Sequence, residues 1–586
     1  MKKIRAFQRL GLAAIAASFG FMAACTPIDV DTDDGLMRAL ESRKRLDRAI
    51  PRLMSISASP GRLEPFIPLL VKMYEEGSPF DREIITALAS SGNPLADSAF
   101  KKAAESTDFK QVIQAAHGAR ATQSAEVQNL LLKNFDRQVN PEVRRVILDT
   151  GTTIKSSAIA AKAKSILNGN LDETPFSLLR TSCNVLEFQK DPDAAGTLLL
   201  AGFHMDGVGR SLGPDCRRAL MALGRDVAVP VLLTAFKLEN KDLNIYIEKH
   251  PDTMTADTVR SDTANMLAIF RAKEAIGPML DFVGNTRRIP VPGTLAIRPA
   301  GDPAWAQWAS LVGAASQAAF FAINDIGVRD NARAKTIFTD IFNWTEPFKI
   351  KFRNAIELTG TTNIEVSQRV NAFRVLRENE LVSTEEVAAM VNVLKGEEFA
   401  DERTFRNWAR AAIATDMLTY LAITARNGDT KALWQLFNDM QEKEFAVPAP
   451  ENEDAPLMAH ANDTIVQRIN AVRPAFELAD RCDTRAACYA GALGNEGLSN
   501  YERIKIVYEL GLSGDHQFFE VICGVYGSFD LFGQIYATNA LANLGTAADI
   551  ERIRTLSRTL AGTMSQIHYQ TARINLENLI ITLANK

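Results

Sequence analysis

The chain has 586 residues, about four times the length of an ordinary domain, which predicts several domains or one repetitive array. Apolar residues make up 46% of the chain and charged residues 23%, which excludes a disordered chain, a collagen and a simple coiled coil. The 66 basic residues are nearly balanced by 70 acidic ones, so the charge gives no reason to expect a nucleic-acid partner.

Residues 1–24 have the layout of a bacterial export signal. Four basic side chains and no acidic one precede residue 10, and residues 10–24 are uncharged and mostly apolar. Such a segment is too short to stay in a bilayer as a spanning helix, and it is removed on export. We therefore expect an exported chain that starts with a short acidic tether, residues 25–35.

The signal ends in Met22-Ala23-Ala24-Cys25. This resembles the lipobox of bacterial lipoproteins, although Met22 stands where that family usually has leucine. The resemblance implies that Cys25 becomes the first residue of the mature chain and carries the lipid acyl chains, palmitate among them. Thr26 follows it, which by similarity to the sorting rule of some Gram-negative lipoproteins favours the periplasmic side of the outer membrane. The alternative is a plain secretory signal with a chance cysteine.

From residue 36 to residue 586 the apolar residues recur at spacings of three and four, with short breaks at Gly, Pro, Asn or Asp. No sustained alternating run indicates a sheet, so we expect an all-α protein. Roughly two dozen helices, paired into hairpins, give units of about 43 residues, a length typical of HEAT-like repeats.

Capping residues predict several helix boundaries. Starts are expected at Asn140-Pro141, at Asp191-Pro192 and at Ser383-Thr384, where a capping side chain precedes a proline or an acid. Stops are expected at glycines, namely Gly224, Gly360, Gly428, Gly511 and Gly545.

Two kinds of sequence phrase recur along the chain. The first phrase is an acid followed, after three residues, by a proline, an apolar residue and a leucine; it occurs at 64–70, 226–232 and 274–280. The second phrase begins with Ala-Leu and ends with Leu-Gly; it occurs at 219–224 and 540–545. These phrases resemble HEAT repeats. The resemblance implies a helical-hairpin repeat solenoid, a HEAT-like superhelix. A TPR array is the alternative, but its 34-residue period and signature are missing.

The predicted organisation has seven segments. They are the signal peptide 1–24, the tether 25–35, N-terminal repeats 36–285, a Pro/Arg loop 286–304, central repeats 305–444, an acidic Pro-containing loop 445–464 and C-terminal repeats 465–586. The two loops carry opposite charges, and they are either binding elements or simple insertions.

Residues 303–324 carry no charge and are long enough to cross a bilayer. However, Gln307, Ser310, Gln317 and Asn324 recur at helical spacing and form one polar stripe. We therefore expect a mostly buried helix with one wet edge rather than a second membrane anchor.

Five cysteines remain once Cys25 is set aside, so at most two disulfides can form. Cys482 and Cys488 can bridge only if a helix breaks between them, and Asp483-Thr484 offers a cap at which the next helix can begin. Two buried thiols are the alternative. Cys183 and Cys216, about one repeat apart, form a second candidate pair, and Cys523 is expected to be a small core residue.

Catalytic and cofactor motifs find little support. The six histidines are scattered singly, so no metal site is expected, and neither a dinucleotide loop, a phosphate loop nor a nucleophile elbow is present. Residues 494–498 faintly resemble the Gly-rich signature of lytic transglycosylases, but the catalytic Glu-Ser of that family is missing upstream. We expect no catalytic residues, no metal and no cofactor.

These patterns predict a lipid-anchored cell-envelope scaffold or binding protein. Its helical repeats would present an extended surface to a protein or peptide partner, with the inner helices lining a concave face. The alternatives are a periplasmic glycan-active or hydrolytic enzyme with an unrecognised site, which a cluster of buried carboxylates would favour, and a purely structural spacer.

Overall fold

The computed structural model describes residues 28–251, 254–286, 303–343, 355–395, 405–426, 429–431, 434, 455–495 and 497–586. The signal peptide, Cys25 and most of both predicted loops lie outside these residues. The described part is helical and contains no β-strand; its one isolated β-bridge joins Met205 and Ser211. The expectation of an all-α protein is confirmed for this part of the chain. It divides into two compact units, Met1–Leu223 and Gly224–Lys586.

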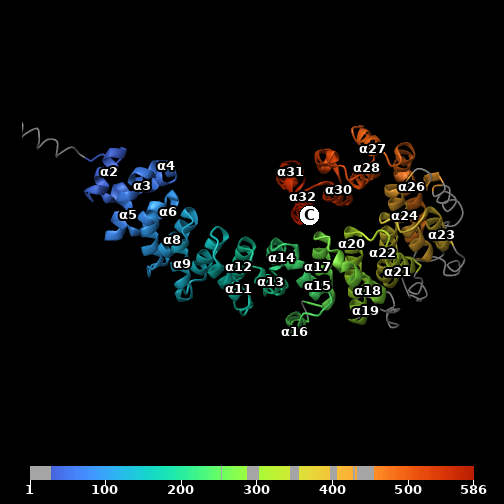
Figure 1. The fold of residues 1–586 in the computed structure, drawn as a ribbon, viewed down its shortest axis with the longest axis horizontal. Helices are drawn as coiled ribbons and strands as arrows, with labels where there is room; N and C mark the ends of the chain where they lie inside the picture. Colours follow the sequence, from blue (N-terminus) through green and yellow to red (C-terminus); the bar gives the residue numbers. More distant parts are fainter. Residues whose placement is uncertain are drawn as a thin grey trace, which may run out of the picture. The chain divides into compact units, whose positions relative to one another are not determined.

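The first unit consists of two rows of helices (Figure 1). Its first row consists of α3 (Leu46–Ser57), α6 (Asp81–Ser91), α8 (Phe109–Thr122), α10 (Pro141–Asp149), α12 (Phe176–Gln189) and α14 (Gly213–Ala222). Its second row consists of α5 (Ile67–Glu76), α7 (Asp97–Ala104), α9 (Ala125–Lys133), α11 (Ser157–Leu167) and α13 (Ala195–Ala201). Each helix packs on the next one in its row, and α2 (Asp33–Glu41) and α4 (Pro60–Leu63) pack on α3.

Small residues let the two rows approach closely. A Cβ added at Gly118 on α8 would lie 2.5 Å from the ring of Phe100 on α7, so this contact requires glycine. Asn140 caps α10 by accepting from the amide of Glu142, and Asp191 caps the short 3₁₀ turn that leads into α13, as the sequence predicts.

Eight described helices form the first row of the second unit, and this row closes on itself. In chain order they are α17 (Ala256–Ile269), α20 (Ser316–Ile326), α22 (Ala355–Glu378), α24 (Phe405–Thr424), α26 (Ala455–Cys482), α28 (Asn500–Leu512), α30 (Leu531–Leu544) and α32 (Gln566–Ala584). Each contacts the next, and α32 at the C-terminus contacts α17 (Figure 1). The last repeats of this unit therefore have neighbours on both sides.

The remaining helices of the second unit flank this row. They are α15 (Arg225–Phe236), α16 (Lys241–Lys249), α18 (Ile276–Thr286), α19 (Pro303–Trp308), α21 (Ala332–Phe342), α23 (Thr384–Lys395), α27 (Ala486–Leu493), α29 (Phe519–Val525) and α31 (Ile550–Thr563). A π-helical turn, η8 (Ala309–Ala315), joins α19 to α20. The closing contacts are specific: Thr582 Oγ1 donates to the carbonyl of Ile269 at 2.8 Å, and the amide of Arg225 donates to Asn585 Oδ1 at 2.9 Å.

The repeat length is not uniform, which corrects the expectation of one period near 43 residues. In the first unit α6, α8, α10, α12 and α14 begin 28, 32, 35 and 37 residues apart. In the second unit, with α19 taken as the start of the segment that η8 joins to α20, the starts of α17, α19, α22, α24, α26, α28, α30 and α32 are 47, 52, 50, 50, 45, 31 and 35 residues apart. A period averaged over the chain therefore mixes long hairpins in the middle of the chain with shorter ones on either side, and the missing 34-residue period is no longer an argument against a TPR-like first unit.

Several predicted boundaries need correction. Gly360 lies inside α22 rather than at a helix end, since a single glycine costs a helix only about 1 kcal/mol. Gly511 also lies inside its helix, where a Cβ would come within 2.7 Å of Ala540 on α30. Gly224 and Gly545 do follow helix ends, whereas Gly428 lies outside the described residues.

The two predicted loops are shorter than the sequence suggests. The acidic loop is predicted to reach residue 464, but α26 begins at Ala455, because a proline is tolerated in the first turn of a helix. For the same reason α19 begins at Pro303, inside the predicted Pro/Arg loop, while α18 runs to Thr286.

The polar stripe over 303–324 is not a wet edge along its whole length. Gln317 Nε2 donates to Ser367 Oγ at 2.7 Å, and Asn324 Nδ2 donates to Glu378 Oε2 at 2.6 Å. Both acceptors lie on α22, so part of the stripe serves to join two helices of the first row.

Candidate functional site

One face of α30 contacts four different elements of the closed row. The residues on this face, spaced four, three and four apart, are Phe532, Tyr536, Asn539 and Asn543. The Phe532 ring lies 6.4 Å, centroid to centroid, from the ring of Tyr420 on α24. The Tyr536 hydroxyl donates to Glu378 Oε1 on α22 at 2.5 Å.

The two amides continue the same row of contacts. Asn539 Nδ2 donates to Asp325 Oδ1 on α20 at 3.3 Å. Asn543 Oδ1 accepts from Arg271 Nη1, in the turn that follows α17, at 2.7 Å. Thus each turn of α30 meets a different hairpin of the second unit, through a different polar or aromatic group. We call the surface of α17, α20, α22 and α24 that α30 contacts the α30 seat.

Glu378 is the hub of this seat. Its Oε1 accepts from Arg374 Nε at 2.9 Å as well as from Tyr536, and its Oε2 accepts from Asn324. The Arg374 guanidinium lies 5.5 Å from the ring centroid of Tyr420 and 5.4 Å from that of Tyr536. A buried arginine held this way by a carboxylate and aromatic rings is strongly positioned.

The electrostatics of the seat reflect its low exposure. Burial alone would lower the pKa of Arg374, but the adjacent Glu378 carboxylate raises that pKa well above its usual value. Burial raises the pKa of Asp325, against the opposing effect of Arg374, and burial together with Glu378 raises the pKa of Tyr536. The phenol therefore stays a hydrogen-bond donor at all physiological pH values.

The seat differs in character from the core beside it. The apolar cluster of the last repeats draws its buried residues from α24 and from α26 to α32, including Leu541, Leu576 and Leu583. By contrast, the hydrogen bonds of α30 with α20, α22 and the turn after α17 join carboxylates, amides, a guanidinium and a phenol. The side chains of Arg374, Glu378 and Tyr536 are buried, so a partner lost here leaves a polar group without water to replace it.

A second buried charged group lies where α24 ends. Lys505 Nζ, on α28, donates to the carbonyls of Ile423 and Ala425 at 3.3 and 2.6 Å and to Glu509 Oε1 at 3.3 Å. Glu509 also pairs with Arg426 at 2.8 Å. Burial lowers the pKa of Lys505 to about 8 and raises the pKa of Glu509. This ammonium satisfies carbonyls at a helix C-terminus, which is a structural role.

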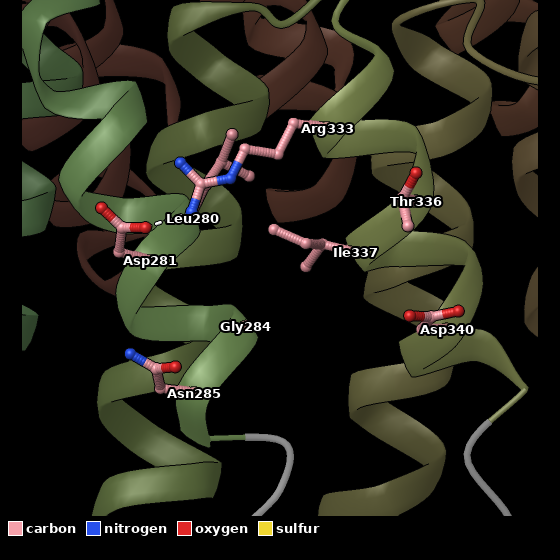
Figure 2. Close-up of a pocket in the computed structure, with 8 residues that line it drawn as sticks. All are labelled: Leu280, Asp281, Gly284, Asn285, Arg333, Thr336, Ile337 and Asp340. Carbon is pink, nitrogen blue, oxygen red and sulfur yellow. Dashed lines mark hydrogen bonds and ion pairs between the residues drawn. The ribbon is translucent and has the colours of Figure 1, made fainter.

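An open groove of about 340 Å³ lies between α18 and α21 (Figure 2). It is lined by Leu280, Asp281, Gly284, Asn285, Arg333, Thr336, Ile337 and Asp340. Arg333 reaches across one end to pair with Asp281, Ile337 points into the space between the helices, and Asp340 lies towards the other end. The side chains of Asp281 and Arg333 are 60% and 53% exposed, so this groove is accessible to a ligand.

Neither surface carries an obvious set of reacting groups. The groove holds no nucleophile paired with a base, and the carboxylates of the seat are engaged by Arg374, Asn324, Tyr536 and Asn539. In the described residues no group of three His, Cys, Asp or Glu side chains could hold a metal ion.

The predicted site residues have different outcomes. Cys25, the expected lipidation site, lies outside the described residues. Cys183 and Cys216 lie at disulfide distance, with Cα atoms 5.1 Å apart, and so do Cys482 and Cys488, at 5.4 Å.

The expected helix break between the second pair is present. α26 ends at Cys482, Asp483 has a φ of 49°, and α27 begins at Ala486. However, the residue before α27 is Arg485, so Asp483-Thr484 is a turn rather than the expected cap. Cys523 is buried, as expected, and burial raises the pKa of its thiol to about 12, so it is a poor nucleophile.

The residues of the α30 seat were not predicted from the sequence. Their only local signal is the spacing of Phe532, Tyr536, Asn539 and Asn543, which marks a polar and aromatic face on an otherwise apolar helix. Glu378 and Asp325 are ordinary surface-type residues in the sequence, and they lie 158 and 214 residues from their partners on α30.

Comparisons with known proteins add no family. No protein-family model matches the chain, and no curated protein matches it significantly. In the described residues, no helix has both the length and the apolar character needed to cross a bilayer.

Proposed function

We propose that this chain is a lipid-anchored cell-envelope protein that binds a protein or peptide partner on a surface of HEAT-like helical repeats. Cys25 is the proposed lipidation site, and the periplasmic side of the outer membrane is the proposed location. The support for the anchor is the resemblance of residues 22–25 to a lipobox. The proposal includes no catalytic residue, cofactor or metal.

The observation that carries the binding function is the groove between α18 and α21. Two successive hairpins supply its walls, so it exists only because the repeats pack side by side. Apolar side chains, carboxylates, an amide and a hydroxyl line it, and these offer contacts for a side chain and for a polar backbone (Figure 2). A peptide segment of the partner is the proposed occupant.

Site-specific photo-crosslinking tests this function. A photoreactive amino acid replaces Thr336 in the groove, or Thr555 on α31 as a matched control, in the full lipoprotein in its native envelope. Both threonines are exposed, and each donates its hydroxyl to the carbonyl four residues earlier. We expect a discrete polypeptide adduct from position 336 and none from position 555. Equal adducts from both positions, or none from either, would contradict the proposal.

A hydrolytic or glycan-active enzyme is the second candidate, and the raised pKa values of Asp325 and Glu509 are the observation in its favour. Both carboxylates have partners that give them a structural role, namely Asn539 for Asp325 and Lys505 with Arg426 for Glu509. For this reason we favour binding. This preference would be reversed if the purified protein hydrolysed envelope glycans and the Asp325→Asn variant did not.

A further inference from the structure

The chain that leads back to Cys25 is folded onto the first hairpin, which consists of α2 and α3 (Figure 1). α2 begins at Asp33, and Thr32 caps it by accepting from the amide of Gly35. The carbonyl of Asp29 also lies on Gly35, where an added Cβ would be 1.8 Å from that oxygen, so glycine is required. The tether is therefore shorter than the sequence predicts, because its second half belongs to the folded body.

Two arginines of the hairpin hold this tether in place. Arg45 Nη1 donates to the carbonyl of Ile28 at 2.9 Å, and Arg52 Nη2 donates to the carbonyl of Asp31 at 3.4 Å. Cys25 precedes Ile28 by three residues, and three residues of fully extended chain span at most about 11 Å. A lipid on Cys25 would therefore hold Arg45 close to the headgroups of the bilayer.

The connection between α2 and α3 carries a cluster of basic side chains. We call residues 42–48 the basic loop. Its four bases and its one acid are all exposed, and they are Arg43, Lys44, Arg45, Arg48 and Asp47. Arg43 pairs with Glu76, whereas Lys44 and Arg48 have no carboxylate partner among the described residues. The surface stays positive when Glu76 and Glu41, just before the loop, are both counted.

Two of these bases occupy backbone positions that disfavour a side chain. The φ angles of Arg43 and Arg45 are 53° and 57°, in the left-handed region, which glycine or asparagine adopts with less strain. Both side chains are exposed, so packing in a core does not account for arginine at either position. Bases kept at strained positions of an exposed loop are typical of a surface that binds a ligand.

The acids of the tether lie away from the basic loop. Asp33 Oδ1 is 3.3 Å from Arg62 Nη2, and Asp29 Oδ1 accepts from the amide of Asp31. Asp33 and Asp34 lie in the first turn of α2, where the helix dipole favours a negative charge. The acids thus lie at the start of α2 and the bases after its end, so the charges of the hairpin are separated.

We propose that the basic loop is a membrane-contact surface that binds the phosphate groups of anionic lipid headgroups. Guanidinium and ammonium groups are suited to phosphate oxygens. Their attraction to an anionic surface extends over about one Debye length, roughly 8 Å at physiological salt, and the short tether keeps the loop near this range. The contact would orient the first unit on the membrane through its first hairpin. The inference rests on the proposed lipidation of Cys25, but it concerns a surface of the folded chain.

The test measures how fast lysines react with an uncharged acylating reagent, with mass spectrometry as the readout. The full mature lipoprotein is reconstituted into vesicles of phosphatidylcholine, with or without phosphatidylglycerol. Lys44 reports on the basic loop, and Lys110, an exposed lysine on α8, is the matched control. We expect Lys44, but not Lys110, to react several-fold more slowly in the anionic vesicles. Added salt should remove the difference, because it screens the charges.

A charge variant tests whether the basic loop causes the protection. Arg43→Gln with Arg48→Gln removes two charges and leaves Arg45 to hold the tether. Each base near an anionic surface changes the occupancy of the contact about fivefold, and two change it about 25-fold, so this variant should lose the protection. Lys133→Gln with Arg137→Gln makes the same charge change in exposed side chains near the end of α9 and should keep the protection.

Equal reaction of Lys44 in both kinds of vesicle would overturn the inference, and so would protection that survives in the Arg43→Gln, Arg48→Gln variant. Protection by inorganic phosphate without vesicles would assign the loop to a soluble anion and also overturn it. Flotation separates the loop from the anchor. Protein that floats with both kinds of vesicle but shows no protection keeps the anchor and rejects the loop. Protein that floats only with anionic vesicles and shows protection supports the loop and rejects the anchor.

Discussion

The hydroxyl of Tyr536 offers the sharpest test of how the closed row is held together. Tyr536→Phe removes one oxygen atom and leaves the ring, which packs against Phe532 with centroids 5.2 Å apart and against the Arg374 guanidinium. The lost interaction is a buried hydrogen bond to the Glu378 carboxylate. A hydrogen bond to a charged group contributes about 1.5 to 3 kcal/mol.

The lower part of that range applies here. Glu378 keeps its contacts with Arg374 and Asn324, so its carboxylate is not left without partners. We expect a loss of about 1.5 kcal/mol in the free energy that holds α30 on its seat, which corresponds to about tenfold faster hydrogen exchange of the α30 and α32 amides. The assay is hydrogen exchange resolved by mass spectrometry under native conditions.

Tyr74→Phe is the matched control. Its buried hydroxyl donates to Gln111 Oε1 at 2.6 Å, a contact between α5 and α8 in the first unit. It is expected to speed exchange near α5 and α8 and to leave exchange in α30 and α32 unchanged. Wild-type exchange rates in the Tyr536→Phe variant, or the same pattern in both variants, would refute the reasoning.

Other predictions follow from the buried charges and the cysteines. Lys505→Met should lower the free energy of unfolding by about 1 to 3 kcal/mol, measured by urea denaturation, because it removes the donor to the carbonyls of Ile423 and Ala425 while Glu509 keeps its pair with Arg426. The pKa of Lys505 is about 8 in the folded chain and 10.5, the ordinary lysine value, in the unfolded chain. Between pH 8 and 10.5 the unfolded chain therefore binds more protons than the folded chain, and the free energy of unfolding of the wild type should rise with pH relative to that of Lys505→Met. Peptide mapping of protein alkylated without reduction should find no free thiol at Cys482 or Cys488, and replacing both by serine should cost about 2 kcal/mol. Cys25→Ser should abolish metabolic labelling by palmitate; full labelling would disprove lipidation.

Local patterns in the sequence were sufficient for the local features of the fold. The three-and-four spacing of apolar residues predicts helices, and Asn140 and Asp191 cap the elements that their sequence positions indicate. The break between Cys482 and Cys488 was also predictable, because disulfide geometry excludes a continuous helix there. These features depend on residues within one or two turns of each other.

The closure of the second unit could not be predicted in this way. It depends on pairs such as Arg225 with Asn585, which are 360 residues apart and include no distinctive residue type. The averaged repeat length failed for a related reason, since period counting assumes that every hairpin has the same length. The prediction that Gly511 ends a helix was wrong. Glycine is required there because α28 approaches Ala540 on α30 closely.

The closed row also changes where a partner can bind. The sequence predicts inner helices that line a concave face, but in the second unit α30 covers part of α17, α20, α22 and α24 through the Glu378, Asp325 and Arg271 contacts. Since α30 is itself a core helix of the closed row, this face is part of the internal packing. The α18–α21 groove lies on the flanking helices and does not include these contacts. Tyr536→Phe should consequently leave the yield of Thr336 adducts unchanged, and a loss of adducts in that variant would mean that the groove depends on the closure of the row.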